Sequence, residues 1–208
     1  MKLTNLDALD AAELQTDPFD YIVVPEFLPP DQLRLVNADY PDIDTAMNHD
    51  LRDLSYGPMF RRLIGEIDIY EFRKHLGDKF NVDITDSPTT VSVRKFCERT
   101  DGHIHTDHPS KLITVLVYFN ESWDSEGGRL RMLRSPSDLE DYTAEVKPLG
   151  GHLLAFHRTD QSWHGHKQFV GERRMLQFNF LRSNVMGLMN QKFGRASTHF
   201  GKRFLGMR

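Results

Sequence analysis

The chain has 208 residues, of which 39% are hydrophobic, and a formal net charge of −4 at pH 7. This length is sufficient for one domain with a complete core, and the composition is ordinary for a soluble globular protein. The slightly acidic balance gives no reason to expect a nucleic-acid partner, and the longest apolar run, residues 112–119, is too short to cross a membrane. Cys97 is the only cysteine, which excludes an internal disulfide, and the acidic first residues lack the apolar core of a signal peptide. We therefore expect a cytoplasmic protein.

Residues 1–85 are expected to form a mixed α/β region that supports the rest of the chain. The run YIVVPEFL at 21–28 predicts a strand or an extended entry. A helix is predicted from residue 29 to about residue 40, because Pro29 and Pro30 stand at its start and Pro41 follows its end. Apolar residues recur near a period of 3.6 in residues 57–79, which predicts one long amphipathic helix there.

The character of the sequence changes at Thr89, where short β-rich runs begin to alternate with turn signals such as Gly127-Gly128 and Gly150-Gly151. Many short strands at this spacing are typical of an antiparallel sandwich or barrel. We predict a single domain, residues 1–208, of mainly β class. Its core, residues 86–182, would be a double-stranded β-helix (jelly roll), with an N-terminal helical layer packed on one sheet.

Residues 183–208 form a basic C-terminal tail, because no Asp or Glu follows Glu172 while Lys and Arg recur to the last residue. A charge run of this kind is usually a solvated segment. An arm that contacts an anionic substrate or partner would have the same composition, and the sequence leaves both interpretations open.

The hexapeptide HIHTDH, residues 103–108, matches two kinds of metal site. In the form H-x-H-x-D-H it resembles the motif of the metallo-β-lactamase fold, in which these side chains bind a pair of zinc ions. That fold places an apolar strand directly before the motif and needs a later bridging Asp. Here the polar run CERTDG precedes the motif and no acidic residue follows Glu172, so a dizinc hydrolase is the weaker interpretation.

The shorter core of this motif, His105-Thr106-Asp107, fits one arm of a mononuclear Fe(II) site. In an extended segment residues i and i+2 project from the same face, so His105 and Asp107 can bind one ion together. A third ligand has to come from a strand remote in sequence, where His164 and His166 are both candidates. Two imidazoles and one carboxylate leave positions open for oxygen activation at Fe(II), whereas zinc more often closes its shell.

Five motifs between Val91 and Arg182 follow one another in an order typical of a known family. They are HTD at 105–107, TVLVYFN, EGGRLRM, the segment VKPLGGHLLAF that leads to His164, and VGERRMLQF. In these motifs the chain resembles the 2-oxoglutarate/Fe(II)-dependent oxygenase superfamily, and in particular its prolyl-hydroxylase-like branch. The resemblance implies that His105, Asp107 and His164 are the metal ligands and the catalytic centre, because His166 falls where the family usually has a non-ligand.

The resemblance also implies a binding site for the distal carboxylate of 2-oxoglutarate. The basic residue that binds this carboxylate would be Arg173 or Arg174, with Tyr118 as a hydroxyl donor and Thr114 on the same face of its strand. A planar guanidinium binds a carboxylate through two hydrogen bonds. Strand alternation favours Arg173, because its face is polar while the face of Arg174 is apolar. The residues that share these faces are Met175, Gln177 and Asn179 for Arg173, and Leu176, Phe178 and Phe180 for Arg174.

The expected function is therefore that of a 2-oxoglutarate-dependent dioxygenase, a hydroxylase that uses Fe(II), 2-oxoglutarate and O₂, with ascorbate as a stimulating reductant. Its substrate would be a small molecule, an amino acid or a peptidyl residue, oxidised at an unactivated C–H bond with release of succinate and CO₂. No membrane partner is expected, and a homodimer is compatible with the sequence. A non-catalytic jelly roll that binds a ligand is the alternative from another class.

Overall fold

The structure of the protein, a computed structural model, describes residues 2–183. The helices in this range are α1 (Leu6–Ala11), α2 (Pro30–Ala38), α3 (Pro58–Asp68) and α4 (Tyr70–Phe80), with a short 3-10 turn η1 (Leu51–Asp53). The strands are β1 (Tyr21–Val24), β2 (His49–Asp50), β3 (Thr89–Cys97), β4 (Lys111–Tyr118), β5 (Leu130–Leu133), β6 (Tyr142–Val146), β7 (Leu153–His157), β8 (His164–Gly165) and β9 (Gly171–Leu181).

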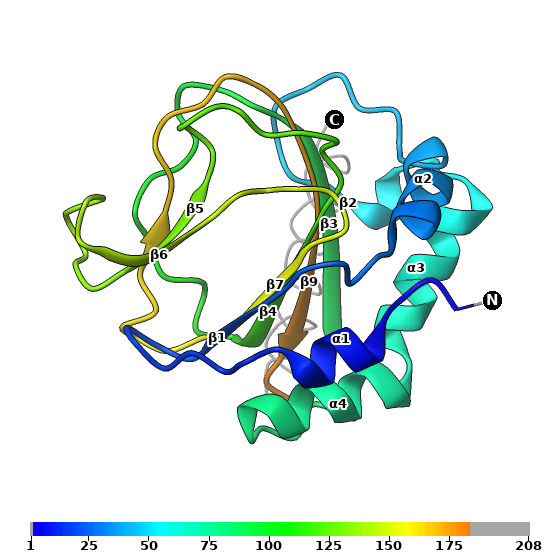
Figure 1. The fold of residues 1–208 in the computed structure, drawn as a ribbon, viewed down its shortest axis with the longest axis horizontal. Coiled ribbons are helices and arrows are strands. Elements are labelled where there is room, and N and C mark those ends of the chain that lie inside the picture. The colour runs from blue at the N-terminus through cyan, green and yellow to red at the C-terminus, as the bar shows by residue number, and fades with distance from the viewer. Residues whose placement is uncertain (1, 184–208) are drawn as a thin grey trace, which may run out of the picture.

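The strands form two antiparallel sheets that together make the jelly roll. The larger sheet has the order β1-β7-β4-β9-β3-β2, and the smaller has the order β6-β5-β8. The smaller sheet faces one side of the larger one, and the helices cover the other side (Figure 1). The prediction of a mainly β jelly roll with a helical layer on one sheet is thus confirmed.

The central strand β4 is buried on both faces, which explains its nearly continuous apolar sequence. Ile113, Val115 and Val117 point into the core shared with the helices. Leu116 and Tyr118 alternate with them and belong to a second core between the sheets. The strand that separates the two cores therefore also supplies one wall of the space between the sheets.

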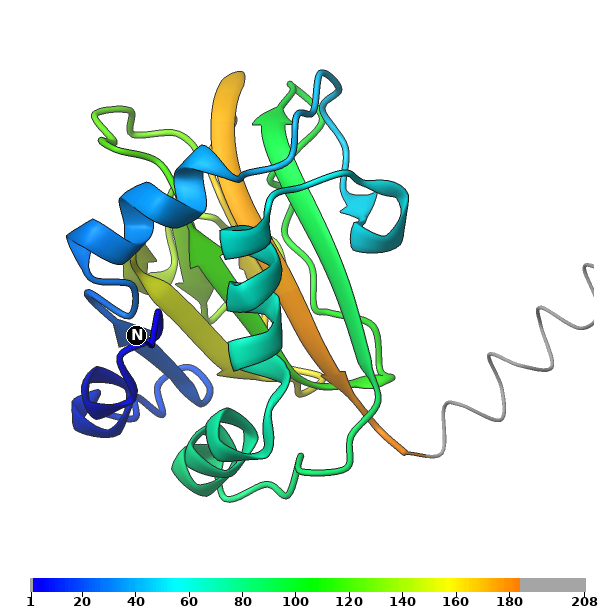
Figure 2. The same ribbon diagram turned by 90° about the vertical axis from the view of Figure 1, so that its right-hand side faces the viewer.

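The helices lie across one face of the larger sheet (Figure 2). Their apolar side chains form one core with those of its strands. Phe60 on α3 has no exposed surface, and its ring lies 5.3 Å from that of Tyr40 and 5.7 Å from that of Phe119, measured between centroids. The Tyr40 contact is edge-on and the Phe119 contact is tilted, and aromatic pairs of this kind add to the stabilisation that burial of a large ring provides.

The single long helix predicted for residues 57–79 is wrong, because α3 and α4 are separated by Ile69, whose backbone is extended (ψ 156°). Burial on α3 ends at Ile67 and resumes on α4 at Phe72, a spacing that a continuous helix would not place on one face. Arg73 supports the break, since its Nε donates to the freed carbonyl of Asp68 at 2.8 Å.

Two further expectations concern membrane-spanning helices and the basic C-terminal tail. Within residues 2–183, no helix combines the length and the apolar character needed to cross a membrane. The basic tail predicted at 183–208 lies, apart from Ser183, outside the described residues.

The packing of Phe60 gives a stability prediction. Phe60→Ala would leave a cavity between α3 and the larger sheet, so we expect the free energy of unfolding to fall by about 3–5 kcal/mol. Urea unfolding followed by circular dichroism would measure it. Leu35→Ala on α2 is the control, because Leu35 is 43% exposed and its truncation should change stability by less than about 1 kcal/mol. Equal losses for the two variants would contradict this view of the core.

Candidate metal centre

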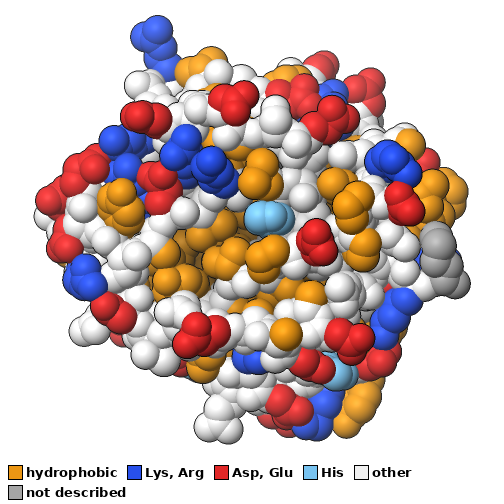
Figure 3. Space-filling model, in the orientation of Figure 1, with side chains coloured by type: hydrophobic (Ala, Val, Ile, Leu, Met, Phe, Trp, Pro, Cys, Tyr) orange, Lys and Arg blue, Asp and Glu red, His pale blue; other side chains and the backbone are white. Residues whose placement is uncertain are grey.

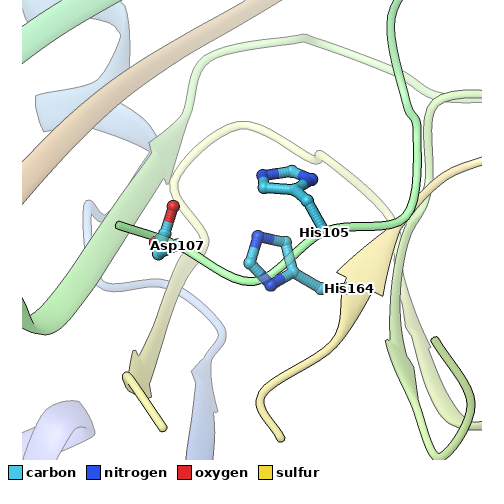
Figure 4. Close-up of side chains that lie close together, drawn as sticks. All are labelled: His105, Asp107 and His164. Atoms are coloured by element: carbon cyan, nitrogen blue, oxygen red, sulfur yellow. The ribbon is translucent and has the colours of Figure 1, made fainter. Parts of the chain in front are cut away.

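The structure brings His105, Asp107 and His164 together in the space between the two sheets. One ligand atom from each residue lies within 4.8 Å of the others, a separation that one metal ion can bridge. The three side chains turn toward one another, with His105 and Asp107 on the segment between β3 and β4 and His164 on β8 (Figure 4). These are the three residues that the family resemblance assigned to the metal.

A β-bridge holds the two histidines in place. The backbone N–H of His105 donates to the carbonyl of His164 at 3.0 Å, and the N–H of His164 donates back at the same distance. His164 itself pairs with Met132 of β5, so His105 is fixed to the edge of the smaller sheet. The ring centroids of the two histidines lie 4.4 Å apart.

Each histidine also presents a defined ring nitrogen. Nδ1 of His105 lies 2.9 Å from the carbonyl oxygen of His103, and Nδ1 of His164 lies 2.9 Å from that of Ser162. A carbonyl oxygen only accepts, so each Nδ1 carries the proton and each Nε2 is left to bind a metal. Burial lowers the pKa of His164 to about 4, which keeps this ring neutral, as a metal ligand must be, at pH 7.

Asp107 is buried and yet ionised. Burial alone would raise the pKa of its carboxyl, but the positive charge of Lys111 and hydrogen bonds from Lys111 and Thr114 outweigh burial and lower it. Lys111 Nζ lies 2.8 Å from Oδ1, and Thr114 Oγ1 lies 2.5 Å from Oδ2. The site therefore holds a carboxylate in place beside the two imidazoles.

The remaining histidines of the hexapeptide do not join this group. His103 is exposed, and Nδ1 of the exposed His108 lies 2.8 Å from the hydroxyl of Ser110. Among residues 2–183, the side chains that could hold a metal are His105, Asp107 and His164, a set that suits one ion. The geometry thus gives no support to a two-zinc site in this part of the chain.

His166, the other candidate for the third ligand, lies in the same cavity but outside the cluster. Its Nδ1 lies 2.9 Å from the carbonyl of Lys167. Burial, together with the positive charge of Arg173, lowers its pKa to about 4. His166 is thus a neutral, buried side chain of the cavity wall.

The cavity next to the metal residues has a volume of about 250 Å³ and is lined by side chains of both sheets. Arg173 lies in its wall and is only 3% exposed. The guanidinium donates to the carbonyl of Gly128 at 2.8 Å, and no Asp or Glu among residues 2–183 forms an ion pair with it. A buried cation without a carboxylate partner is costly unless a ligand supplies the negative charge.

Tyr118 lies beside this arginine, with its ring 5.4 Å from the guanidinium carbon of Arg173. Its side chain is completely buried, and its hydroxyl has no hydrogen-bond partner in the described part of the chain. Burial raises the pKa of the phenol, so the hydroxyl stays protonated and can donate. An unpaired donor and an unpaired cation side by side fit a carboxylate ligand.

Arg174, the alternative anchor, points to the opposite face of β9. It pairs with Glu172 and lies over the ring of Tyr40, 5.5 Å from its centroid. It does not line the cavity between the sheets. The alternation of β9 therefore places the two neighbouring arginines on different sides of the larger sheet.

Thr114, predicted to contact 2-oxoglutarate, lines the cavity, but its hydroxyl proton is directed to Asp107. Sequence reasoning missed two partners of Asp107: Lys111, which contacts its carboxylate, and Arg158, whose Nε donates to its backbone carbonyl at 3.0 Å. The turn signal His108-Pro109-Ser110 was the available hint that Lys111 returns toward Asp107.

On the face of the molecule shown in Figure 3, a histidine side chain is surrounded by hydrophobic side chains, with basic groups near one edge of this area. An acidic side chain also lies beside this histidine. A low-dielectric wall strengthens the interactions of charged groups placed in it.

Comparisons with known proteins agree with this geometry. Residues 92–182 match the model of the 2OG-Fe(II) oxygenase superfamily. A Pseudomonas putida prolyl-4-hydroxylase has a similar structure, with 18% identity over 86% of this chain and 90% of that chain and a TM-score of 0.56. An oxidoreductase of the 2OG-Fe(II) oxygenase family from Burkholderia pseudomallei is 12% identical over 86% and 92% of the two chains, with a TM-score of 0.55. Curated proteins gave no match. The resemblance inferred from the five motifs is confirmed.

The geometry of the cluster predicts the effect of removing its carboxylate. Asp107→Ala takes away a direct ligand, so we expect Fe(II) binding to weaken by more than the roughly 10–100-fold that loss of an outer partner costs. Anaerobic titration against a competing chelator would measure it. Asp42→Ala is the control, because Asp42 is fully exposed and its one ion pair within residues 2–183 is with Lys95 at 3.4 Å. Unchanged Fe(II) affinity in Asp107→Ala would refute the assignment.

Proposed function

We propose that the chain is a member of the 2-oxoglutarate/Fe(II)-dependent oxygenase superfamily, whose model matches residues 92–182, and that it hydroxylates an unactivated C–H bond at an Fe(II) ion held by His105, Asp107 and His164. The observation that carries the proposal is that two groups able to bind a ligand line the same cavity. A cluster of metal ligands lies beside a buried arginine that lacks a carboxylate partner among the described residues.

The donor set supports Fe(II) as the metal. Two neutral imidazoles and one carboxylate are the arrangement found in non-haem Fe(II) oxygenases, because it leaves coordination positions for cosubstrate and oxygen. Bound Fe(II) supplies the activation of O₂, which is coupled to conversion of 2-oxoglutarate into succinate and CO₂. The protein would contribute the geometry, the charge and the cavity in which the reactants meet.

The cosubstrate would be bound by Arg173 and Tyr118. A guanidinium and a phenol hydroxyl can together provide the hydrogen bonds that a distal carboxylate needs, and both are buried where these bonds are strong. Thr114 contributes indirectly in this proposal, by holding Asp107 rather than by donating to 2-oxoglutarate. Arg174 has no part in it, because it lies on the other face of the sheet.

The substrate belongs to the broad class that this superfamily oxidises: a small molecule, an amino acid or a peptidyl residue. Prolyl 4-hydroxylases are among the proteins of similar structure, which makes a prolyl residue one candidate. The lining of the cavity includes the polar side chains of Asn48, Arg94, Asp101 and Gln177, which favour a substrate with hydrogen-bonding groups. A cytoplasmic location, consistent with the free thiol of Cys97, is part of the same proposal.

A non-catalytic jelly roll is the less favoured alternative. A protein that had kept only the fold would have no need for a complete ligand cluster, two oriented histidines and a buried arginine beside them. The burial of Asp107, His164 and Arg173 together is costly, and such a group of buried polar side chains is expected of a working site.

The decisive test is an anaerobic titration of the metal-free protein with Fe(II) and then with 2-oxoglutarate. We expect a visible charge-transfer band that saturates at one 2-oxoglutarate per chain, because the chelate needs both the metal and the open positions. Succinate should then form when O₂ is admitted. Absence of the band, with tight binding of two zinc ions instead, would reject the proposal in favour of the dizinc hydrolase.

The two neighbouring arginines allow a matched test of the cosubstrate site. Arg173→Ala should raise the 2-oxoglutarate concentration for half-maximal succinate formation by at least about tenfold, since loss of one partner of a buried charge pair costs about 2–5 kcal/mol. Arg174→Ala should leave that concentration nearly unchanged. The reverse result would move the anchor to Arg174.

A further inference from the structure

Both carboxylate oxygens of Asp107 already have partners. Lys111 Nζ lies 2.8 Å from Oδ1 and makes a charge-assisted hydrogen bond, while the Thr114 hydroxyl lies 2.5 Å from Oδ2. The Lys111 side chain is only 14% exposed and lines the same cavity as the metal residues. An ammonium group therefore stands next to the carboxylate that is to bind a doubly charged ion.

The local structure holds this contact firmly. The turn after the ligand is closed by the N–H of Lys111, which donates to the carbonyl of His108 at 3.0 Å and brings the lysine back over Asp107. Arg158 holds the backbone of Asp107 from another element, through its hydrogen bond to the carbonyl at 3.0 Å. With backbone and side chain both held, the carboxylate cannot rotate freely.

Lys111 and Thr114 differ in how readily each can release the carboxylate oxygen of Asp107 that it contacts. An ammonium and a metal cation repel each other, so they will occupy different oxygens of the carboxylate. Thr114 has a second acceptor, since its Oγ1 also lies 3.3 Å from Oδ1 of Asn179. The hydroxyl can therefore turn to Asn179 and release Oδ2, whereas Lys111 keeps Oδ1.

We propose that Lys111 is a positioning residue that restricts Asp107 to binding the metal through one oxygen. Carboxylates bind metal ions through one oxygen or through both. A second bound oxygen would fill a position that an oxygen-activating site must keep open for 2-oxoglutarate and O₂. The inference rests on the proposed function and adds to it the residue that protects the open position.

This role has a signature that a purely structural ion pair would not give. The charge of Lys111 opposes the metal charge, so removing it should preserve or strengthen Fe(II) binding. The freed Oδ1 would then compete for the open position, and the reaction with O₂ should slow. A residue that merely supported the loop would, on removal, weaken metal binding and turnover together.

The test compares Lys111→Met with the wild-type protein and with Lys95→Met. Lys95 is a suitable control because it also pairs with an aspartate, Asp42, at 3.4 Å and is similarly buried (18% exposed), but it does not line the cavity. The measurements are the Fe(II) dissociation constant under anaerobic conditions, the charge-transfer band with 2-oxoglutarate, and the rate of succinate formation with O₂ in the absence of substrate.

We expect Lys111→Met to bind Fe(II) at least as tightly as the wild type while its succinate rate falls about 10–100-fold, with Lys95→Met unchanged in both. Parallel loss of Fe(II) binding and turnover, or no change in the rate, would overturn the role of Lys111. Lys111→Gln, which keeps a polar side chain, replaces Lys111→Met if the latter fails to fold. A wild-type protein that forms no band with Fe(II) and 2-oxoglutarate would instead reject the proposed function itself.

Discussion

The backbone bridge between His105 and His164 is the interaction on which the rest of the site depends. Its two reciprocal hydrogen bonds of 3.0 Å join a segment before β4 to a two-residue strand of the smaller sheet. A backbone pair of this kind fixes position and direction together, so both imidazoles project to the same place. Asp107 then needs only the normal alternation of an extended chain to complete the cluster.

The second constraint is the two-sided burial of the larger sheet. One face packs on the helices and excludes water with large apolar side chains, while the other carries the charged groups of the cavity. Arg173 and Arg174 show the effect most clearly, because one step along β9 separates a buried cation in the cavity from an ion pair on the helix side. The helical layer thus stabilises the sheet without occupying the space that the site requires.

Sequence patterns predicted most of this arrangement, and their one clear failure in the fold is informative. The jelly roll, the helical layer and the helix at α2 follow from alternation, turn residues and prolines, which act locally. The helix expected across residues 57–79 is interrupted at Ile69, where a one-residue slip in the apolar pattern marks the change of direction. Tertiary packing favours two short helices, each with its own buried face, over one continuous helix.

The sequence by itself determined the fold class, the family resemblance and the identity of the residues able to bind a metal, because these are carried by residue type, order and short-range periodicity. Only the tertiary structure decided which atoms are free to act. It shows that His103 and His108 stand apart from the metal cluster, and that Lys111 and Thr114 share the carboxylate of Asp107. The physical reason is that hydrogen-bond partners and burial depend on contacts between strands far apart in the chain, which no local pattern specifies.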